Sequence, residues 1–139
     1  MSDTEPVPLG FEPVDRGGPF FMQMAPVYRK RLDTGVVLGL RVAPKHGNSH
    51  GNAHGGMLMT MADGAFFDNI MLQREAADRI VTANMSADFM SAARVGDWLE
   101  AHVTVHRRGK LLSFADCLIK VGDRVVLRAN ATFVKPPSS

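Results

Sequence analysis

Asp63 is the residue whose chemistry fits its surroundings least. It lies in a long apolar stretch, and on a helix its neighbours three and four positions away are Met59, Thr60, Phe66 and Phe67. A carboxylate in an apolar environment is costly unless it is paired or protonated, so residues of this kind often have a chemical role. Asp63 is therefore a candidate functional residue. The alternative is a structural carboxylate that accepts a hydrogen bond across a subunit interface or points to water.

The loop before this stretch is the second candidate for chemistry. It has the sequence HGNSHGNAHGG at residues 46–56 and leads into the start of the expected helix. The first N–H groups of a helix are unpaired and lie at the positive end of its dipole, where they favour anions and developing oxyanions. Gly55 and Gly56 lack a Cβ and would let a carbonyl group approach closely. A glycine pair can also serve only to shape the turn, so by itself it is weak evidence for a site.

Three histidines in the same loop, His46, His50 and His54, recur every four residues and raise the question of a metal site. On a helix they would share one face, but glycines at about 1 kcal/mol each disfavour a helix in this segment. Without a helix the spacing loses its geometric meaning. The loop also holds no cysteine or carboxylate that would complete a tetrahedral set. We therefore expect neither a metal ion nor another cofactor.

The elements that must position these residues are one helix and a set of strands. The run from Met57 to Leu72 is apolar on nearly all sides and predicts a buried helix of about five turns. Asp68 lies about 140° round this helix from Asp63, so we do not expect the two acids to form a paired site. Alternating or apolar runs bounded by turn residues predict strands at 27–32, 36–42, 80–89, 97–107, 111–121 and 124–134.

This order of elements predicts an α+β fold, in which a curved antiparallel sheet of about six strands wraps around one long central helix. The chain has 139 residues, of which 45% are hydrophobic and 22% charged, as is typical of one globular domain. Acids, prolines and glycines dominate residues 1–18, which predict a flexible N-terminal arm, and the domain itself is expected at 19–136.

Composition and charge disfavour several classes of protein. No apolar run is long enough for a membrane helix and no signal peptide is visible, so we expect no membrane contact and a cytoplasmic location. The single cysteine, Cys117, excludes an intramolecular disulfide and a cysteine-cluster zinc site. The net charge of +2 is too small to indicate a nucleic-acid partner.

The pattern Asn48-x-x-Gly51-x-x-His54-Gly55-Gly56, followed by Asp63 on an apolar helix, resembles the hotdog-fold acyl-CoA thioesterases of the PaaI-like, phenylacetate-pathway type. The resemblance covers about residues 19–135 and includes the order of the strands. Further matches are Thr82, the run Phe89-Met90-Ser91, Gly96-Asp97 and the turn Gly109-Lys110. The resemblance implies a thioesterase that hydrolyses an acyl- or aryl-coenzyme A to the free acid and coenzyme A.

The resemblance also implies a role for each matched residue. The N–H of Gly55 would bind the thioester carbonyl, and Asn48 beside it would position the carbonyl or the water. Asp63, reaching in from the partner subunit, would act as general base or nucleophile. Thr82 would orient the water or the carboxylate, and His54 would pack or form a hydrogen bond within the loop.

Contacts with the substrate and with a second subunit follow from the same resemblance. The residues expected to contact the substrate or its coenzyme A are Gly56, Met90, Ser91, Arg107, Arg108 and Lys110. The three cations could bind phosphates, although a basic hairpin tip is often no more than a solvated turn. The family pairs two protomers into a homodimer with active sites at the interface, and we expect the dimers to assemble as a tetramer.

Two other functions are compatible with the same residues. A hydratase or dehydratase on this fold would need a histidine as its acid and base, and His54 is available. A non-catalytic protein that binds acyl-CoA or another small ligand would keep the fold and give Asp63 a structural role. The sequence leaves the acyl group open among aromatic, short and medium-chain groups.

Overall fold

The computed structural model describes residues 6–75 and 77–137, which form one helix, seven strands and two short 3-10 turns. The helix is α1 (Gly55–Met71), and the 3-10 turns are η1 (Phe21–Met24) and η2 (Pro44–His46). The strands are β1 (Glu12–Pro13), β2 (Tyr28–Leu32), β3 (Gly35–Arg41), β4 (Val81–Phe89), β5 (Trp98–Arg108), β6 (Leu112–Val121) and β7 (Arg124–Val134). Among these described residues, no helix has the length and hydropathy of a membrane-spanning segment.

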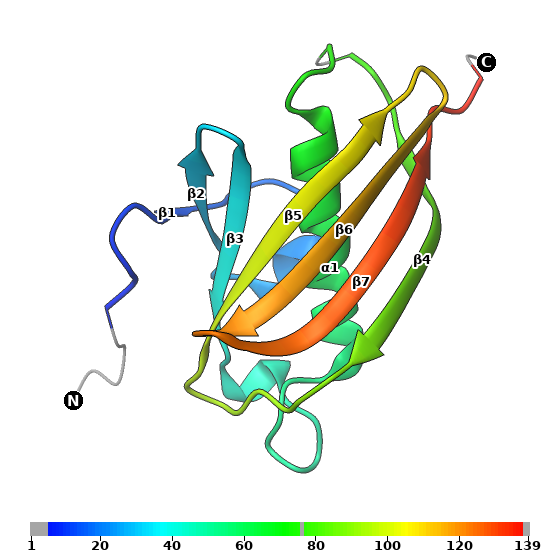
Figure 1. The fold of residues 1–139 in the computed structure, drawn as a ribbon. Coiled ribbons are helices and arrows are strands. Elements are labelled where there is room, and N and C mark those ends of the chain that lie inside the picture. Colours follow the sequence, from blue (N-terminus) through cyan, green and yellow to red (C-terminus); the bar gives the residue numbers. More distant parts are fainter. Residues whose placement is uncertain (1–5, 76, 138–139) are drawn as a thin grey trace.

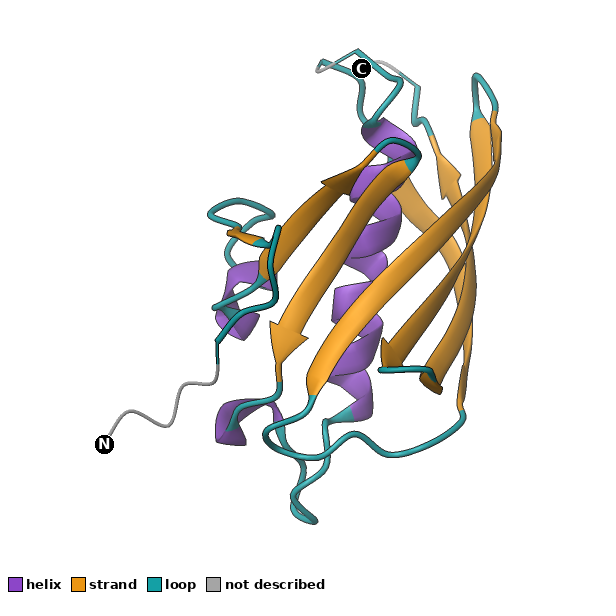
Figure 2. Ribbon diagram, turned by 60° about the vertical axis from the view of Figure 1, so that its left-hand side comes forward, coloured by secondary structure: helices purple, strands orange, loops and turns teal. Residues whose placement is uncertain are grey.

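The strands form one antiparallel sheet in the order β1-β2-β3-β5-β6-β7-β4. The sheet curves around α1, so that the helix lies against its concave face (Figures 1 and 2). This confirms the predicted fold class and the six predicted strands. The additional strand is β1, in which Glu12 pairs with Arg29 and Pro13 with Tyr28 at the edge of the sheet. Part of segment 1–18 therefore joins the sheet, and the flexibility of the rest stays a prediction.

Alternation along the strands explains why the helix is enclosed on this face. Leu99 and Ala101 of β5, Cys117 and Ile119 of β6, and Leu127 of β7 are fully buried and face α1. Polar side chains alternate with them on the convex face, which contacts solvent. Apolar area removed from water is the main term that holds sheet and helix together.

Helix α1 begins at Gly55, two residues before the predicted start. Side-chain capping accounts for this, because Nδ1 of His54 accepts a 2.8 Å hydrogen bond from the Gly56 N–H. A cap of this kind satisfies one of the unpaired N–H groups of the first turn and makes the glycine pair part of the helix. The helix is also less enclosed than predicted: its face around Asp63 and Phe67 is partly exposed, Phe67 by 43%.

A buried asparagine fixes the helix relative to the sheet. Asn69 is 2% exposed, and its Nδ2 donates hydrogen bonds to the carbonyls of Val36 (2.9 Å) and Ala65 (2.8 Å). Its Oδ1 accepts from the Val36 N–H at 3.0 Å. All the polar atoms of this side chain are therefore paired, as a buried amide requires. Gly35 leaves room for this amide, because a Cβ on Gly35 would lie 2.5 Å from Oδ1 of Asn69.

Candidate functional site

Asp63 and Thr82 meet on the open face of the helix. The Thr82 hydroxyl donates a 2.6 Å hydrogen bond to Oδ1 of Asp63. Thr82 pairs with Phe133 and Asn84 with Thr132, and the register shifts between the two pairs. Because neighbouring residues of β7 face opposite sides, this bulge turns Thr82 towards the helix and Asn84 away from it. The bulge thus brings together the hydroxyl and the carboxylate that the sequence singled out.

The Asp63–Thr82 pair lines a pocket of about 520 Å³. Most of the other lining side chains are apolar and come from α1, β4, β7 and the N-terminal segment: Val14, Phe20, Phe21, Phe67, Ile80, Val81 and Phe133. A pocket of this volume with a few polar groups is the usual form of a small-molecule site. Its chemistry suits a ligand with an apolar part next to a group that reacts with or binds a carboxylate.

Asp68 also lines this pocket. The pocket extends along the helix and reaches both side chains, although they lie on different faces of the ideal helix. Burial raises the pKa of the Asp68 carboxyl, and the positive charge of Arg29 opposes this effect. Within residues 6–75 and 77–137 the Asp68 carboxyl has no hydrogen bond or ion pair shown by the structure.

The N-terminus of α1 presents an unpaired donor. The His54 cap occupies the Gly56 N–H, and the Leu58 N–H donates to the His54 carbonyl at 3.0 Å. The Gly55 N–H has no acceptor within the described part of the chain. Gly55 also packs closely against Phe89 at the end of β4, since a Cβ on it would lie 3.2 Å from the ring. The predicted oxyanion donor is therefore free to bind a ligand oxygen.

Asn48 holds its own loop together. Its Oδ1 accepts hydrogen bonds from the N–H groups of His50 (2.9 Å) and Asn52 (3.2 Å). The Asn48 N–H in turn donates to the Asn52 carbonyl at 2.7 Å. The side chain of Asn48 uses only its Oδ1 in these bonds, so its exposed Nδ2 is left as a donor. The geometry fits the predicted role of orienting a carbonyl or a water.

The three histidines of the loop have three different environments. His46 is 3% exposed, and its Nδ1 accepts from the Ala43 N–H while Nε2 donates to the Met24 carbonyl, both at 2.8 Å. Burial lowers the pKa of His46, and the bond to Met24 partly counters this. His50 is exposed, and His54 caps the helix. In the part of the chain that the structure describes, no three His, Cys, Asp or Glu side chains cluster as metal ligands would.

Met90 and Ser91 close the end of β4. The Met90 side chain is exposed, and its N–H donates to the Val126 carbonyl at 2.8 Å. Oγ of Ser91 donates to the Val125 carbonyl and accepts from Arg124, both at 2.7 Å. The Ser91 hydroxyl therefore forms its hydrogen bonds within the protein, whereas the exposed Met90 side chain is free to contact a ligand.

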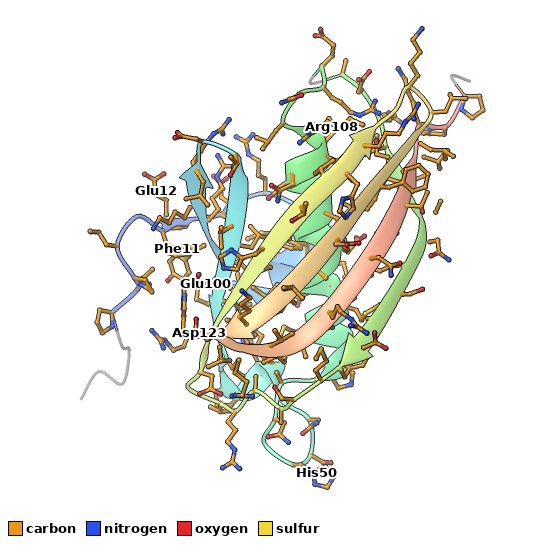
Figure 3. The ribbon with its side chains drawn as sticks, viewed as in Figure 1. Phe11, Glu12, His50, Glu100, Arg108 and Asp123 are labelled. Atoms are coloured by element: carbon orange, nitrogen blue, oxygen red, sulfur yellow. The ribbon has the colours of Figure 1, made fainter. Side chains whose placement is uncertain are left out.

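Arg108, one of the three cations predicted to bind coenzyme A, lies at the other end of the helix (Figure 3). Arg108 donates hydrogen bonds to the carbonyls of Ile70 (3.3 Å) and Asn69 (2.9 Å), which caps the end of α1. Arg107 and Lys110 are exposed and make no hydrogen bond or ion pair among the described residues. Sequence reasoning did not anticipate the helix-capping contact of Arg108, because it joins residues that are 38 and 39 positions apart.

Within one chain the predicted site residues therefore form separate groups. Asp63 and Thr82 share the pocket, whereas Asn48, His54 and Gly55 gather at the start of α1 and do not line it. Gly55 and Asp63 are eight residues apart, about 12 Å along a helix axis. One thioester cannot contact both within a single chain.

Comparison with known proteins places this chain in the thioesterase superfamily. The family model described as "Thioesterase superfamily" matches residues 50–128. The chain is 37% identical over 131 residues to the Pseudomonas aeruginosa protein named "Putative esterase PA0474", and the match covers 94% of this chain and 98% of that protein.

Solved structures agree with this assignment. The Escherichia coli PaaI protein from the phenylacetic acid degradation operon superposes with a TM-score of 0.73 at 25% identity, covering 83% of this chain and 87% of that one. A hypothetical thioesterase of Streptococcus pneumoniae, solved with coenzyme A, has a TM-score of 0.71 at 24% identity, covering 81% and 87%. With its helix enclosed by a curved sheet and its acid and hydroxyl paired beside a pocket, the chain belongs to the thioesterase superfamily and is structurally close to the PaaI-type hotdog proteins.

Proposed function

We propose that this protein is an acyl-CoA thioesterase, which hydrolyses the thioester of an acyl- or aryl-coenzyme A to the free acid and coenzyme A. The observation that carries the proposal is the Asp63 carboxylate, which accepts a 2.6 Å hydrogen bond from Thr82 in a largely apolar pocket. A carboxylate at the edge of an apolar cavity suits the activation of water next to an apolar acyl group.

In the proposed reaction, a water oxygen forms a bond to the thioester carbonyl carbon while Asp63 takes the proton. The C–S bond then breaks, and coenzyme A leaves as a thiolate that takes the proton back from Asp63. In the alternative, the Asp63 carboxylate attacks the carbon, the C–S bond breaks and coenzyme A leaves as a thiolate. Water then cleaves the resulting mixed anhydride to the free acid and the Asp63 carboxylate, and a proton of that water passes to the thiolate. The Thr82 hydroxyl orients the carboxylate in both cases, because its hydrogen bond fixes one of the two carboxylate oxygens.

The carbonyl oxygen becomes negatively charged in this reaction and needs a donor. The unpaired Gly55 N–H at the start of α1 is available as this donor. The Nδ2 of Asn48, in the loop that leads into α1, is available as a second one. A single donor of this kind contributes about 3 kcal/mol to the transition state. The exposed Met90 and the cations Arg107 and Lys110 are proposed to contact the rest of the coenzyme A, as the family resemblance implies.

We propose that each active site is shared by two subunits. Gly55 and Asp63 of one chain are about 12 Å apart along the helix, so the donor and the base must come from different copies. Strand β4 lies at the edge of the sheet, and large apolar side chains are exposed on and near it: Phe67, Val81, Phe89 and Met90. Pairing of two β4 edges would continue the sheet and cover this surface. Further assembly to a tetramer stays a prediction, which light scattering would measure.

The first test is the release of free thiol from a panel of acyl- and aryl-coenzyme A esters. Asp63→Asn should reduce turnover by roughly 10²-fold or more, because it keeps the shape and removes the base. Asp123→Asn, the same change in the exposed β6–β7 turn, is the matched control and should leave turnover unchanged. An Asp63→Asn protein that keeps wild-type turnover would contradict the proposed mechanism.

The second test addresses the shared site. Asn48→Ala and Asp63→Asn proteins, each inactive, are mixed, unfolded mildly and refolded together. A mixed dimer then has one site with both changes and one site with neither, so activity should return towards half per heterodimer. Heterodimers that are verified but inactive would place Asn48 and Asp63 in the same site of one chain.

The two alternative functions have distinct outcomes in the same assays. A binding protein would bind acyl-CoA without releasing thiol. A hydratase would remove the ultraviolet absorbance of an enoyl-CoA, with His54 as its acid and base. His54 already uses Nδ1 to cap the helix, which leaves only Nε2 for proton transfer.

A further inference from the structure

The pocket that contains Asp63 has a wall built from outside the matched family region. Five of its lining residues come from the segment before β2: Val14, Arg16, Gly17, Phe20 and Phe21. This segment leaves β1 at the edge of the sheet and crosses to the side of α1 that the sheet does not cover (Figure 1). Segment 14–21 and the proposed catalytic carboxylate therefore face the same cavity.

Phe21 is the part of this segment that packs most closely against the helix. It is 9% exposed, and a Cβ at Gly64 would lie 2.3 Å from its ring. A Cβ at Gly17 would lie 2.6 Å from the same ring, on a residue with a φ of +128°. The ring thus fits between two residues that must lack a side chain. Gly64 directly follows Asp63, so the ring contacts the helix backbone beside the acid.

Gly64 has no other evident reason to be a glycine. In a helix interior, glycine is less favourable than alanine by about 1 kcal/mol. An alanine methyl here would overlap the Phe21 ring, so the glycine accommodates the ring at the expense of helix propensity. In the sequence alone Gly64 only interrupts an apolar helix, and the packed Phe21 ring explains it.

Backbone hydrogen bonds lie at both ends of the segment. The Val14 N–H donates to the Val27 carbonyl at 2.8 Å, and the Met22 N–H donates to the Gly18 carbonyl at 3.0 Å. Before it, the Phe11 ring packs edge-on against Trp98 with centroids 5.2 Å apart. Segment 14–21 therefore forms a wall with defined contacts on both sides.

We propose that segment 14–21 closes the acyl end of the active site, and that Phe21 is a specificity-determining residue that limits the length of the acyl group. The inference rests on the proposed thioesterase function and deepens it. Phe67, Ile80 and Val81 give the pocket an apolar side that suits an apolar acyl group. The other lining residues include the polar side chains of Arg29, Thr60 and Asp68. The Phe21 ring then occupies the volume that further methylene groups would need.

The test compares kcat/KM along a series of straight-chain acyl-CoA esters from two to twelve carbons. Phe21→Ala opens the wall, and each methylene newly buried contributes about a factor of four in binding. The ratio of kcat/KM for long over short chains should therefore rise by more than tenfold relative to wild type. Phe21→Leu, which keeps an apolar side chain, should give a smaller shift in the same direction and guards against misfolding of the alanine variant.

Met24→Ala is the matched control. Met24 is the other buried residue of η1, is 5% exposed and does not line the pocket. Its truncation should lower stability but leave the preference for chain length unchanged. If both Phe21 variants change kcat/KM by one common factor for all chain lengths, as is expected for Met24→Ala, then Phe21 does not limit the length of the acyl group.

Binding of S-alkyl-coenzyme A thioethers, which cannot be hydrolysed, separates this inference from the proposed function. A protein that releases no thiol from any ester overturns the proposed function. In that case the Kd values of the thioether series still test whether Phe21 limits the length of the chain that the pocket accepts. Longer alkyl chains should bind more tightly to Phe21→Ala than to wild type, and an identical length dependence in both proteins would overturn the inference.

Discussion

Replacement of His46 by alanine should destabilise the protein strongly, although His46 lies next to the proposed site and takes no part in it. The ring joins η2 to η1 through two hydrogen bonds of 2.8 Å, one from the Ala43 N–H and one to the Met24 carbonyl. Loss of the ring leaves both backbone groups without a partner. An unsatisfied buried group costs about 1–3 kcal/mol, and the partly exposed Ala43 N–H recovers some of this from water.

The expected loss is therefore about 2–4 kcal/mol, a large part of the 5–15 kcal/mol that stabilises a typical domain. Urea unfolding at pH 8, followed by circular dichroism, measures it. His50→Ala is the matched control, because His50 is exposed in the same loop and should change the free energy of unfolding by less than about 0.5 kcal/mol. Equal unfolding midpoints for His46→Ala and His50→Ala would refute the reasoning.

The same side chain gives a pH dependence of known sign. Burial holds the pKa of His46 below its ordinary value, so the unfolded chain binds this proton more readily than the folded protein does. The stability that His46 provides is complete above about pH 6.5 and is lost as the pH falls through the lower, folded pKa. The difference between wild type and His46→Ala should therefore shrink between pH 8 and pH 5. A difference that grows on acidification would show that the ring is held in its charged form.

Four further predictions concern charged and buried polar residues of the fold. Burial raises the pKa of Asp68, so Asp68→Asn should raise the urea midpoint at pH 7. This gain should vanish as the pH falls below about 4, where the carboxyl is protonated in the folded and the unfolded protein. An unchanged midpoint at pH 7 would mean that the charged Asp68 carboxylate does not destabilise the folded protein. Asn69→Leu leaves backbone groups unpaired and should cost about 2–4 kcal/mol in urea unfolding, and a neutral result would contradict the role of this amide. Arg108→Ala should lower stability by about 1–3 kcal/mol, because it removes charged hydrogen bonds to the end of α1. The double variant Arg107→Ala, Lys110→Ala should instead raise KM for acyl-CoA but not for an acyl-pantetheine, and equal effects on both substrates would exclude phosphate contacts.

The sequence predicted the elements well because their patterns are local. The apolar run after Gly56 and the alternation in β5 each need only a few neighbouring residues to be recognised. The isolated acid on the helix was equally visible, since Asp63 contrasts with the residues one turn away. Its environment, rather than any distant contact, identified it as a candidate.

Features that depend on distant contacts were not visible in this way. The bulge that turns Thr82 inward is defined by its pairing with β7, about fifty residues later. The burial of His46 depends on the Met24 carbonyl, and the end of α1 depends on Arg108. The packing of Phe21 explains Gly64 only after the N-terminal segment has been placed against the helix. Such contacts leave no periodic signal in a single sequence.

The strand order has a consequence for how the chain folds and opens. Strands β6 and β7 meet across the short turn at Gly122 and Asp123, whereas β3 pairs with β5 through Arg41 and Trp98. The latter pairing closes a loop of roughly 57 residues, which costs about 2–3 kcal/mol more chain entropy than the short turn.

Every proposed catalytic residue, from Asn48 to Thr82, lies inside that long loop. A local opening that separates β3 from β5 therefore frees the start of the segment that carries Asn48 and Asp63, whereas Thr82 stays on β4, which pairs with β7. In native-state hydrogen exchange, the amides of α1 should thus exchange together with those of β3, at a lower free energy than the central amides of β6. The segment that carries most of the proposed catalytic residues is in this sense enclosed by the strand pairing with the higher entropy cost.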